Sequence, residues 1–322
     1  MDHWNGVGNG WRINSRTVME YSIIVPVYNS EDSLDALFSS VCEALGAIGK
    51  EFEIIFVDDY SSDGSWEKLL AIKETAKIPV RLIRFAANYG QHSATFCGLK
   101  YAKGKVMITI DDDLQNPPSE IIKILGKIGE ADTDLVYGIG ERAHSTTRKV
   151  GSRLWKFGAR KIDGGLGEGS SFRALTAELR DKLVQHNHSV IFIDELLYWH
   201  TNHIQFVNVE HHPRKSGRSG YTPFKLLRMV IKLSFNYSTV PLKLMTYFGV
   251  FLSIISFIFG TLFIIRKAFF GVGVTGFTAT IVTILFSTSV ILISLGIIGK
   301  YLSNIFIALN NKPSFSIKET KL

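Results

Sequence analysis

Two long runs without a single charged residue lie near the C-terminus of this 322-residue chain, at 244–265 and 268–299. A helix needs about 20 predominantly apolar residues to cross the hydrocarbon core of a bilayer. Two adjacent runs of this length are rare in soluble cores, so buried helices of a soluble domain are the weaker alternative. We therefore predict two transmembrane helices, at 245–265 and 277–298, that form a hairpin over 244–300.

The basic residues around the two runs predict how the hairpin is oriented. Lys225, Arg228, Lys232 and Lys243 precede the first run, Lys300, Lys312 and Lys318 follow the second, and Arg266 and Lys267 lie between them. Because basic residues favour the cytoplasmic side, the globular part and the C-terminus are expected to be cytoplasmic. Residues 1–20 have no apolar core typical of a signal peptide, and we expect a disordered leader there.

The net charge of +7 is concentrated around the apolar runs and in residues 142–161. Aromatic residues lie mostly inside the apolar segments and do not alternate with basic residues as base-stacking surfaces require. Anionic lipid headgroups and phosphates are therefore the expected partners, and nucleic acid is not. Cys42 and Cys97 are the only cysteines, and both are expected to be packed free thiols.

Strand-like and helix-like patterns alternate from residue 21 to residue 137. Apolar runs predict strands at 21–27, 52–57, 80–85, 106–110 and 134–137, and helical spacing predicts helices at 34–48, 65–77, 93–102 and 119–129. This alternation is typical of an α/β domain with a mostly parallel sheet, which we expect to extend over residues 21–220. Residues 221–243 are predicted to form an amphipathic interfacial segment, and residues 301–322 a cytoplasmic tail.

Polar residues follow four of the predicted strands at their carboxyl ends. The four segments are 26–29 (Pro-Val-Tyr-Asn), 58–59 (Asp-Asp), 88–90 (Asn-Tyr-Gly) and 111–113 (Asp-Asp-Asp). Ligands of open parallel sheets bind outside the carboxyl ends of the strands. We therefore expect the four segments to line one site.

The three consecutive aspartates at 111–113 have two interpretations. Burying three like charges is costly without a cation, and Mg²⁺ or Mn²⁺ prefers carboxylate oxygens while leaving positions open for phosphates. Aspartate is also common in solvated turns, and Ser119 with Glu120 has the pattern of a cap for the next helix. On these residues alone, a metal site and a plain turn are equally supported.

The glycine pattern narrows what this edge binds. No G-x-G-x-x-G follows the first predicted strand and no G-x-x-x-x-G-K-[ST] occurs, which disfavours dinucleotide oxidoreductases and P-loop NTPases. The partial match at 138–140 (Gly-Ile-Gly) is interpreted as a plain turn. A diphosphate ligand then needs a metal held by Asp111 and Asp113, and Asp58 is placed to accept hydrogen bonds from a base or ribose.

Four motifs resemble those of a known family. They are Pro26-Val27-Tyr28-Asn29, Asp58-Asp59 with Ser61-Ser62-Asp63-Gly64, Asn88-Tyr89-Gly90-Gln91-His92, and Asp111-x-Asp113-Leu114-Gln115-Asn116-Pro117-Pro118. With these motifs the chain, from residue 21 on, resembles the inverting GT-A glycosyltransferases of family 2 that load a sugar onto a polyprenyl phosphate. Undecaprenyl-phosphate 4-deoxy-4-formamido-L-arabinose transferases and the polyprenyl-phosphate glucosyltransferases of O-antigen modification are such enzymes.

The resemblance implies a GT-A nucleotide-sugar-binding domain, interfacial helices and two transmembrane helices in the bacterial inner membrane. The expected activity moves a sugar from a nucleotide-diphosphate sugar to polyprenyl (undecaprenyl) phosphate, with Mg²⁺ or Mn²⁺ as cofactor. Two alternatives remain: a glycosyltransferase acting on another lipid or glycan acceptor, and a non-catalytic, membrane-tethered sugar-nucleotide sensor. The sugar, the base of the donor and the formation of a homo-oligomer are left open.

The resemblance also implies roles for individual residues. The expected metal ligands are Asp111, Asp113 and Gln115. The expected nucleotide-sugar-binding residues are Pro26, Tyr28, Asn29, Glu31, Asp58, Asn88, Gly90, Gln91 and Asp112. The expected catalytic residues are Asp112, Asp113, Arg173 and Arg214. The acceptor phosphate is expected to meet Arg142, Arg148, Arg214, Arg218, Ser219 and Tyr221, because arginine pairs with phosphate in a bidentate way.

Overall fold

The computed structural model describes residues 19–130, 132–140, 169–185, 192–212, 235, 239–270, 276–309 and 313–322. The strands are β1 (Tyr21–Val27), β2 (Phe52–Asp58), β3 (Val80–Phe85), β4 (Val106–Thr109), β5 (Leu135–Gly140), β6 (Arg173–Thr176), β7 (Ile204–Val209) and β8 (Ile317–Lys321). The helices are α1 (Leu34–Gly46), α2 (Ser65–Thr75), α3 (Gln91–Tyr101), the 3₁₀ turn η1 (Pro118–Glu120), α4 (Ile121–Ile128), α6 (Ala177–Val184), α7 (Ile193–His200), α9 (Val240–Phe270) and α10 (Phe277–Leu309).

The described strands form one eight-stranded sheet in the order β7-β5-β6-β4-β1-β2-β3-β8. The central strands β4, β1, β2 and β3 pair in parallel, and β7 is parallel to β5. Within this sheet only β6 and β8 run antiparallel to their neighbours. The predicted α/β domain with a mostly parallel sheet is confirmed.

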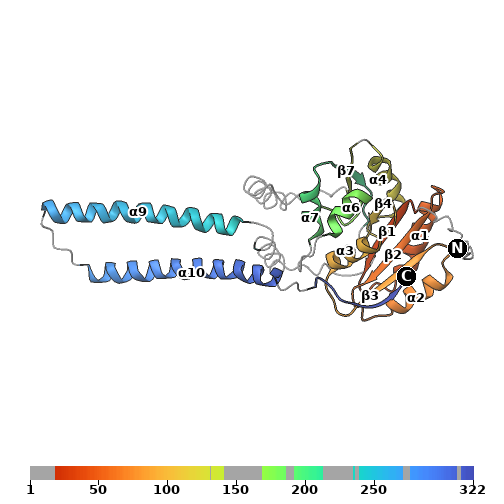
Figure 1. Cartoon of the computed structure of the whole chain (residues 1–322), viewed down its shortest axis with the longest axis horizontal. Helices are drawn as coiled ribbons and strands as arrows, with labels where there is room; N and C mark the ends of the chain where they lie inside the picture. The colour runs from red at the N-terminus through yellow and green to blue at the C-terminus, as the bar shows by residue number, and fades with distance from the viewer. Residues whose placement is uncertain are drawn as a thin grey trace, which may run out of the picture.

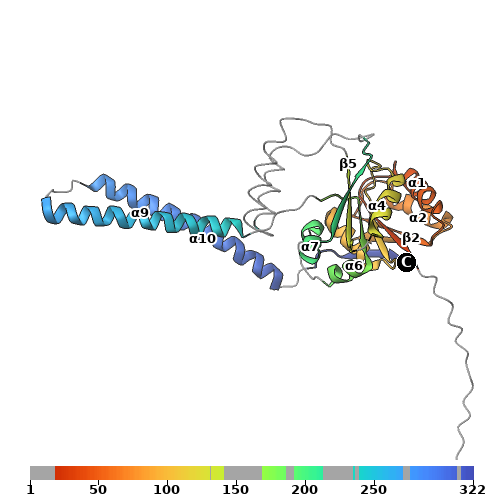
Figure 2. The same cartoon turned by 90° about the horizontal axis from the view of Figure 1, so that it is seen from above.

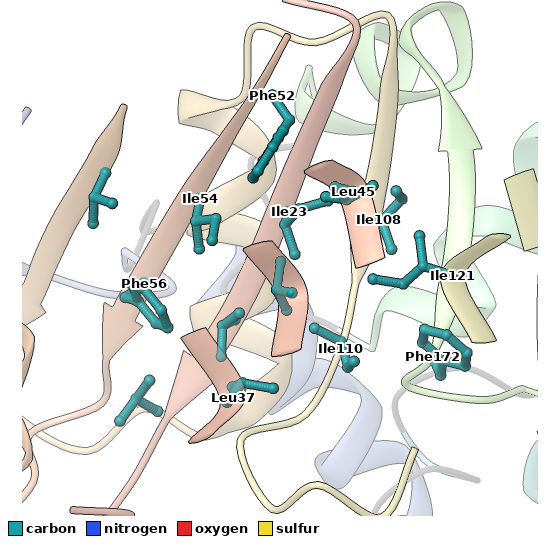
Figure 3. Close-up of a cluster of buried hydrophobic side chains, with 14 of the residues drawn as sticks. Ile23, Leu37, Leu45, Phe52, Ile54, Phe56, Ile108, Ile110, Ile121 and Phe172 are labelled. Atoms are coloured by element: carbon teal, nitrogen blue, oxygen red, sulfur yellow. The ribbon is translucent and has the colours of Figure 1, made fainter. Parts of the chain in front are cut away.

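Helices cover both faces of the sheet, with α1, α2 and α4 on one side and α6 and α7 on the other (Figure 2). The central strands are therefore apolar on both faces, and every residue of β2 is buried. Alternate side chains of a strand point to opposite faces, so Ile54 packs toward α1 while its neighbour Ile55 packs toward α3. Figure 3 shows part of the first of these two cores, to which Ile54 of β2, Leu37 of α1 and Ile121 of α4 belong.

The segment 138–140, predicted to be a turn, is the second half of β5. Gly138 and Gly140 pair with Val207 and Val209 of β7. Both glycines allow another side chain to approach the strand closely. A Cβ on Gly138 would lie 2.6 Å from a ring carbon of Phe172, and one on Gly140 would lie 2.5 Å from His211 Cβ. The turn prediction was wrong, since glycine here makes room for a neighbouring side chain and does not reverse the chain.

The two apolar runs form α9 and α10, which project from the domain as a long hairpin (Figure 1). By length and composition, the candidate membrane spans are Val240–Leu262 and Thr283–Ile307, neither of which is buried inside the protein. Both helices are longer than the predicted spans, and α10 continues past Lys300 because residues 301–309 contain no glycine or proline to end it.

The predicted C-terminal tail is not a separate segment. Residues Ile317–Lys321 form β8, which pairs antiparallel with β3 and closes one edge of the sheet. The chain therefore returns from the hairpin into the domain that it left. The two cysteines lie in that domain as free thiols, as expected, with Cys97 buried and Cys42 half-buried.

Candidate functional site

A pocket of about 520 Å³ opens at the carboxyl edge of the central strands. Its lining residues are Pro26, Val27, Tyr28, Ser30, Asp59, Asn88, Gly90, Gln91, Asp111, Asp112 and Asp113. They come from the segments that follow β1, β2, β3 and β4. The four polar segments therefore converge as predicted, because parallel strands end at the same edge of the sheet.

Asp111 is held by two side chains from different parts of the domain. Gln91 Nε2 donates to its Oδ1 and Ser171 Oγ donates to its Oδ2, both at 2.5 Å. Loss of solvation raises the pKa of Asp111 to about 6, and the carboxylates of Asp113 and Asp112 add to the increase. Ionised Asp111 is thus electrostatically unfavourable near neutral pH, which a bound cation would relieve.

Asp112 joins the segment after β4 to the segment after β1. Its Oδ2 accepts hydrogen bonds from the Tyr28 N–H at 3.0 Å and from Ser30 Oγ at 2.5 Å. Its backbone carbonyl accepts another from Ser33 Oγ at 2.6 Å. Burial raises the pKa of Asp112, although these hydrogen bonds oppose the increase. Asp112 therefore shapes the pocket wall as well as lining it.

The acidic segment turns back on itself at Leu114, whose φ is 57°, so that the Gln115 N–H donates to Asp113 Oδ1 at 3.1 Å. Within the described residues, no three His, Cys, Asp or Glu side chains converge as a complete metal cage. Magnesium-like ions, however, commonly use one or two carboxylates and complete their shell with water and phosphate oxygens. The carboxylates of Asp111 and Asp113, facing one pocket, fit such an ion.

Gln115, the third predicted metal ligand, does not line the pocket. Its backbone carbonyl accepts a hydrogen bond from the His212 N–H at 2.8 Å, which fastens the end of the β7 segment to the acidic segment. The structure therefore places Gln115 beside the acidic cluster and outside the cavity.

Asp58, predicted to contact the base or ribose, also lies outside the pocket. Its fully buried carboxylate lies 3.2 Å from Arg84 Nε and accepts a hydrogen bond from the Ser61 N–H at 3.2 Å. The neighbouring Asp59 lines the pocket in its place. Successive side chains at the end of a strand point to opposite sides, so only one of the two can face the ligand.

Asn29 and Glu31, predicted to bind the nucleotide sugar, are absent from the pocket lining. The Ser62 N–H donates to Asn29 Oδ1 at 2.8 Å, and the Gly64 N–H donates to Glu31 Oε2 at 3.0 Å. Both side chains are thus used to hold the segment after β2 against the segment after β1. Ser30, between them, was not predicted and does line the pocket.

Arg173, a predicted catalytic residue, is 3% exposed and lies on β6 inside the sheet. Its Nη1 donates to Asp194 Oδ1 at 2.6 Å, and Tyr137 Oη donates to the same oxygen at 2.9 Å. A guanidinium buried and paired in this way does not line the pocket. The structure therefore joins Arg173 to α7, and its charge acts on Asp111 from behind the pocket, so its catalytic role stays a prediction.

The predicted acceptor-phosphate residues lie outside the described residues, as does most of the interfacial segment 221–243. They are Arg142, Arg148, Arg214, Arg218, Ser219 and Tyr221. Of the described residues, Gly140 ends β5 and pairs with Val209, the last residue of the neighbouring strand β7. A Cβ on Gly140 would lie 2.5 Å from His211 Cβ, so the segment after β7 lies against the end of β5.

The sequence of the site was compared with known proteins. A model of the family described as Glycosyl transferase family 2 matches residues 22–181, a range that includes every residue lining the pocket. The SfII prophage-derived bactoprenol glucosyl transferase of Shigella flexneri is 31% identical over 316 residues, which cover 94% of this chain and 98% of the relative. The chain belongs to glycosyltransferase family 2.

Two further comparisons concern one other relative and one solved structure. An undecaprenyl-phosphate 4-deoxy-4-formamido-L-arabinose transferase of Pseudomonas syringae is 31% identical over 304 residues, covering 92% of this chain and 90% of the relative. A solved structure of glucosyl-3-phosphoglycerate synthase from Mycobacterium tuberculosis covers 72% of this chain and 83% of that one, with 16% identity and a TM-score of 0.49. Membership of family 2 makes the chain a glycosyltransferase, and the GT-A fold predicted from its motifs is confirmed.

Proposed function

We propose that the chain is a membrane-anchored inverting glycosyltransferase that moves a sugar from a nucleotide-diphosphate sugar to polyprenyl phosphate. The observation that carries this proposal is an acidic pocket at the carboxyl edge of a family 2 domain that continues into two apolar helices. The relatives named for bactoprenol and undecaprenyl phosphate support the same acceptor class, because their similarity covers both the domain and the hairpin.

The pocket is suited to a nucleoside diphosphate and its sugar. Tyr28 lines the pocket and is 51% exposed, which leaves its ring available to stack on a base. The side-chain amides of Asn88 and Gln91 line the same cavity and offer both donors and acceptors to ribose or sugar hydroxyls. Asp112 would lie beside the sugar, where its carboxylate can accept hydrogen bonds.

Asp111 and Asp113 would hold Mg²⁺ or Mn²⁺. When bound, the ion would neutralise the charge that develops on the leaving nucleoside diphosphate. Gln91 and Ser171 orient Asp111 through their hydrogen bonds, so its oxygens are fixed before a ligand arrives. This arrangement takes the place of a glycine-rich phosphate loop, which is absent after β1.

The acceptor needs no general base, because a polyprenyl monophosphate is already an anionic oxygen nucleophile at neutral pH. The protein must instead bring two anionic groups together, a task that suits arginine. We assign it to Arg214, with Arg142, Arg148 and Arg218 as further contacts.

The connection from α10 to β8 supports an active site that faces the membrane. The chain enters β8 from α10 at Ile317, which pairs with Phe85 at the carboxyl end of β3. The hairpin is therefore connected to the edge that carries the pocket. We infer that both helices cross the bacterial inner membrane and that the domain lies on its cytoplasmic side, where nucleotide sugars and the basic flanking residues belong.

Labelled-sugar transfer tests the proposal directly. Membranes containing the protein would be incubated with undecaprenyl phosphate and a panel of radiolabelled UDP- and GDP-sugars. We expect one donor to label a lipid product with inverted anomeric configuration, EDTA to abolish transfer, and Mn²⁺ to restore it. A label that appears only in a soluble glycan would favour a different acceptor. The absence of transfer from every donor would contradict the proposal.

A further inference from the structure

The C-terminal strand β8 touches the segment that carries part of the pocket lining. It pairs with β3 from Leu82 to Phe85, and the pairing continues where the Ala86 N–H donates to the Ser316 carbonyl at 2.9 Å. The next residues, 86–90, include the lining residues Asn88 and Gly90. We call residues 86–90 the β3–α3 loop. One end of this loop is therefore anchored to the last residues of the chain.

An aromatic stack extends this contact toward the pocket. The ring of Phe315, just before β8, stacks on Phe85 with centroids 5.0 Å apart and planes 12° apart. Phe85, which is fully buried, meets Tyr89 of the β3–α3 loop edge-on at 5.6 Å. Phe315 and Tyr89 both pack against the apolar core on the α3 side of the sheet. Phe315 thus supports the loop through one intervening ring.

The pocket side of the loop is fastened to Asp59. Its two carboxylate oxygens accept the Tyr89 N–H at 2.7 Å and the Gly90 N–H at 2.8 Å, and its backbone carbonyl accepts Asn88 Nδ2 at 3.3 Å. Gly90 has a φ of 89°, which a residue with a side chain rarely adopts. The loop is therefore held in one conformation from two sides, by Asp59 at the pocket and by Phe315 behind it.

We propose that the C-terminal strand positions the donor site, with Phe315 as a positioning residue that holds Asn88 and Gly90 in their binding conformation. Ordering a loop before the ligand arrives lowers the entropic cost of binding. Because β8 directly follows the membrane hairpin, the donor pocket is completed by the part of the chain that returns from the membrane. This inference rests on the proposed function, since it takes the pocket to be the site of a nucleoside diphosphate.

The test compares full-length Phe315→Ala with wild type in detergent. We expect the amides of residues 86–90 to exchange with deuterium about three- to tenfold faster, which is the loss expected for one aromatic contact. The affinity for UDP or GDP with Mn²⁺, and the KM for the sugar nucleotide, should weaken by a similar factor. The KM for undecaprenyl phosphate should not change. A conservative Phe315→Tyr variant should restore both exchange and affinity.

Lys318→Ala is the matched control, because this side chain is exposed on the same strand. Thermal unfolding of each variant shows whether the domain stays folded. Unchanged exchange in Phe315→Ala, or faster exchange with wild-type nucleotide affinity, would overturn the positioning role. A wild type that binds neither nucleotide would overturn the proposed function and the donor role together. The two failures can be told apart, because failure of the proposed function is seen in the wild type, whereas failure of the positioning role is seen only by comparing Phe315→Ala with a wild type that binds nucleotide.

Discussion

The guanidinium of Arg84 lies 3.2 Å from the carboxylate of Asp58, and the Asp58 side chain is completely buried. Arg84 also lies over the ring of Trp66, at 5.3 Å from its centroid. The pair connects the carboxyl ends of β2 and β3 directly behind the pocket. Burial raises the pKa of Asp58, and the hydrogen bonds from Ser61 and the charge of Arg84 oppose that increase. Asp58 is thus used inside the domain and does not line the pocket.

Arg84→Met should destabilise the domain by about 3 kcal/mol, because removing one partner leaves an uncompensated buried carboxylate. Chemical unfolding in detergent, followed by tryptophan fluorescence, measures the change. Lys68→Met is the control, since its salt bridge with Asp35 is exposed and should contribute little. Equal losses in the two variants would contradict the importance of the buried pair.

Gly98→Ala should destabilise the protein although alanine favours helices. A Cβ at Gly98 would lie 2.3 Å from Ile24 Cγ2, so α3 would have to move away from β1, at a cost of about 1–3 kcal/mol. Gly126→Ala in α4 meets nothing within 4 Å and should be neutral or stabilise by about 0.5–1 kcal/mol. Chemical unfolding of both variants measures the change, and we expect the free energy of unfolding to fall in Gly98→Ala and to stay equal or rise in Gly126→Ala.

Asp111→Asn should abolish transfer and yet raise the melting temperature in EDTA at pH 7.5. The pKa of this carboxyl is raised from 3.8 to about 6, so the folded state loses stability as the pH rises through this range, and the loss is complete above about pH 6. Below about pH 4, the carboxyl is protonated in both folded and unfolded states and the cost disappears. The difference between variant and wild type should therefore shrink as the pH is lowered from 7.5 to 4.5. A constant difference would show that charge is not its cause.

Arg214→Ala should lower turnover about a hundredfold, because one charged contact to phosphate at a desolvated site is lost. Arg214→Lys should restore only part of it, since an ammonium group lacks the bidentate geometry. Saturation kinetics in both substrates separate the effects, and the KM for the donor should change little. Near-normal turnover of the alanine variant would point to Arg142 and Arg148 instead.

The topology is tested by cysteine labelling in intact cells, with Cys42 and Cys97 replaced by serine. A membrane-impermeant maleimide should label Gly276→Cys, directly before α10, from outside the cell. Lys318→Cys on β8 should react only after the membrane is permeabilised. Labelling of Lys318→Cys in intact cells would reverse the proposed orientation.

Most of the sheet and the position of the pocket follow from local patterns in the sequence. Continuous apolar runs mark β1 to β4, and the polar residues after them must share one edge because the strands are parallel. Which of Asp58 and Asp59 lines the pocket was harder to predict, because it depends on the side of the strand to which each side chain points. Arg173 was assigned to the site from its motif, and its burial could not be predicted because it depends on Asp194, which comes from a distant helix.

Strand β8 could not be recognised from its own residues. Its sequence, Ile-Lys-Glu-Thr-Lys, is polar, as is common for an edge strand, and resembles an ordinary tail. Its partner β3 lies more than two hundred residues earlier in the chain. The pairing depends on contacts between distant parts of the chain, and no local pattern predicts such contacts.

The place of β8 in the chain also has a consequence for biosynthesis. The ribosome makes the first seven strands before the hairpin, and β8 only after both apolar helices have emerged. Domains fold largely in the order of synthesis, so the edge of β3 must stay unpaired while the hairpin is being inserted. An unpaired edge is prone to pair with other strands. Final folding of the domain would thus wait until both helices have been made, and a chain whose hairpin fails to insert would keep an aggregation-prone edge that quality-control machinery can recognise.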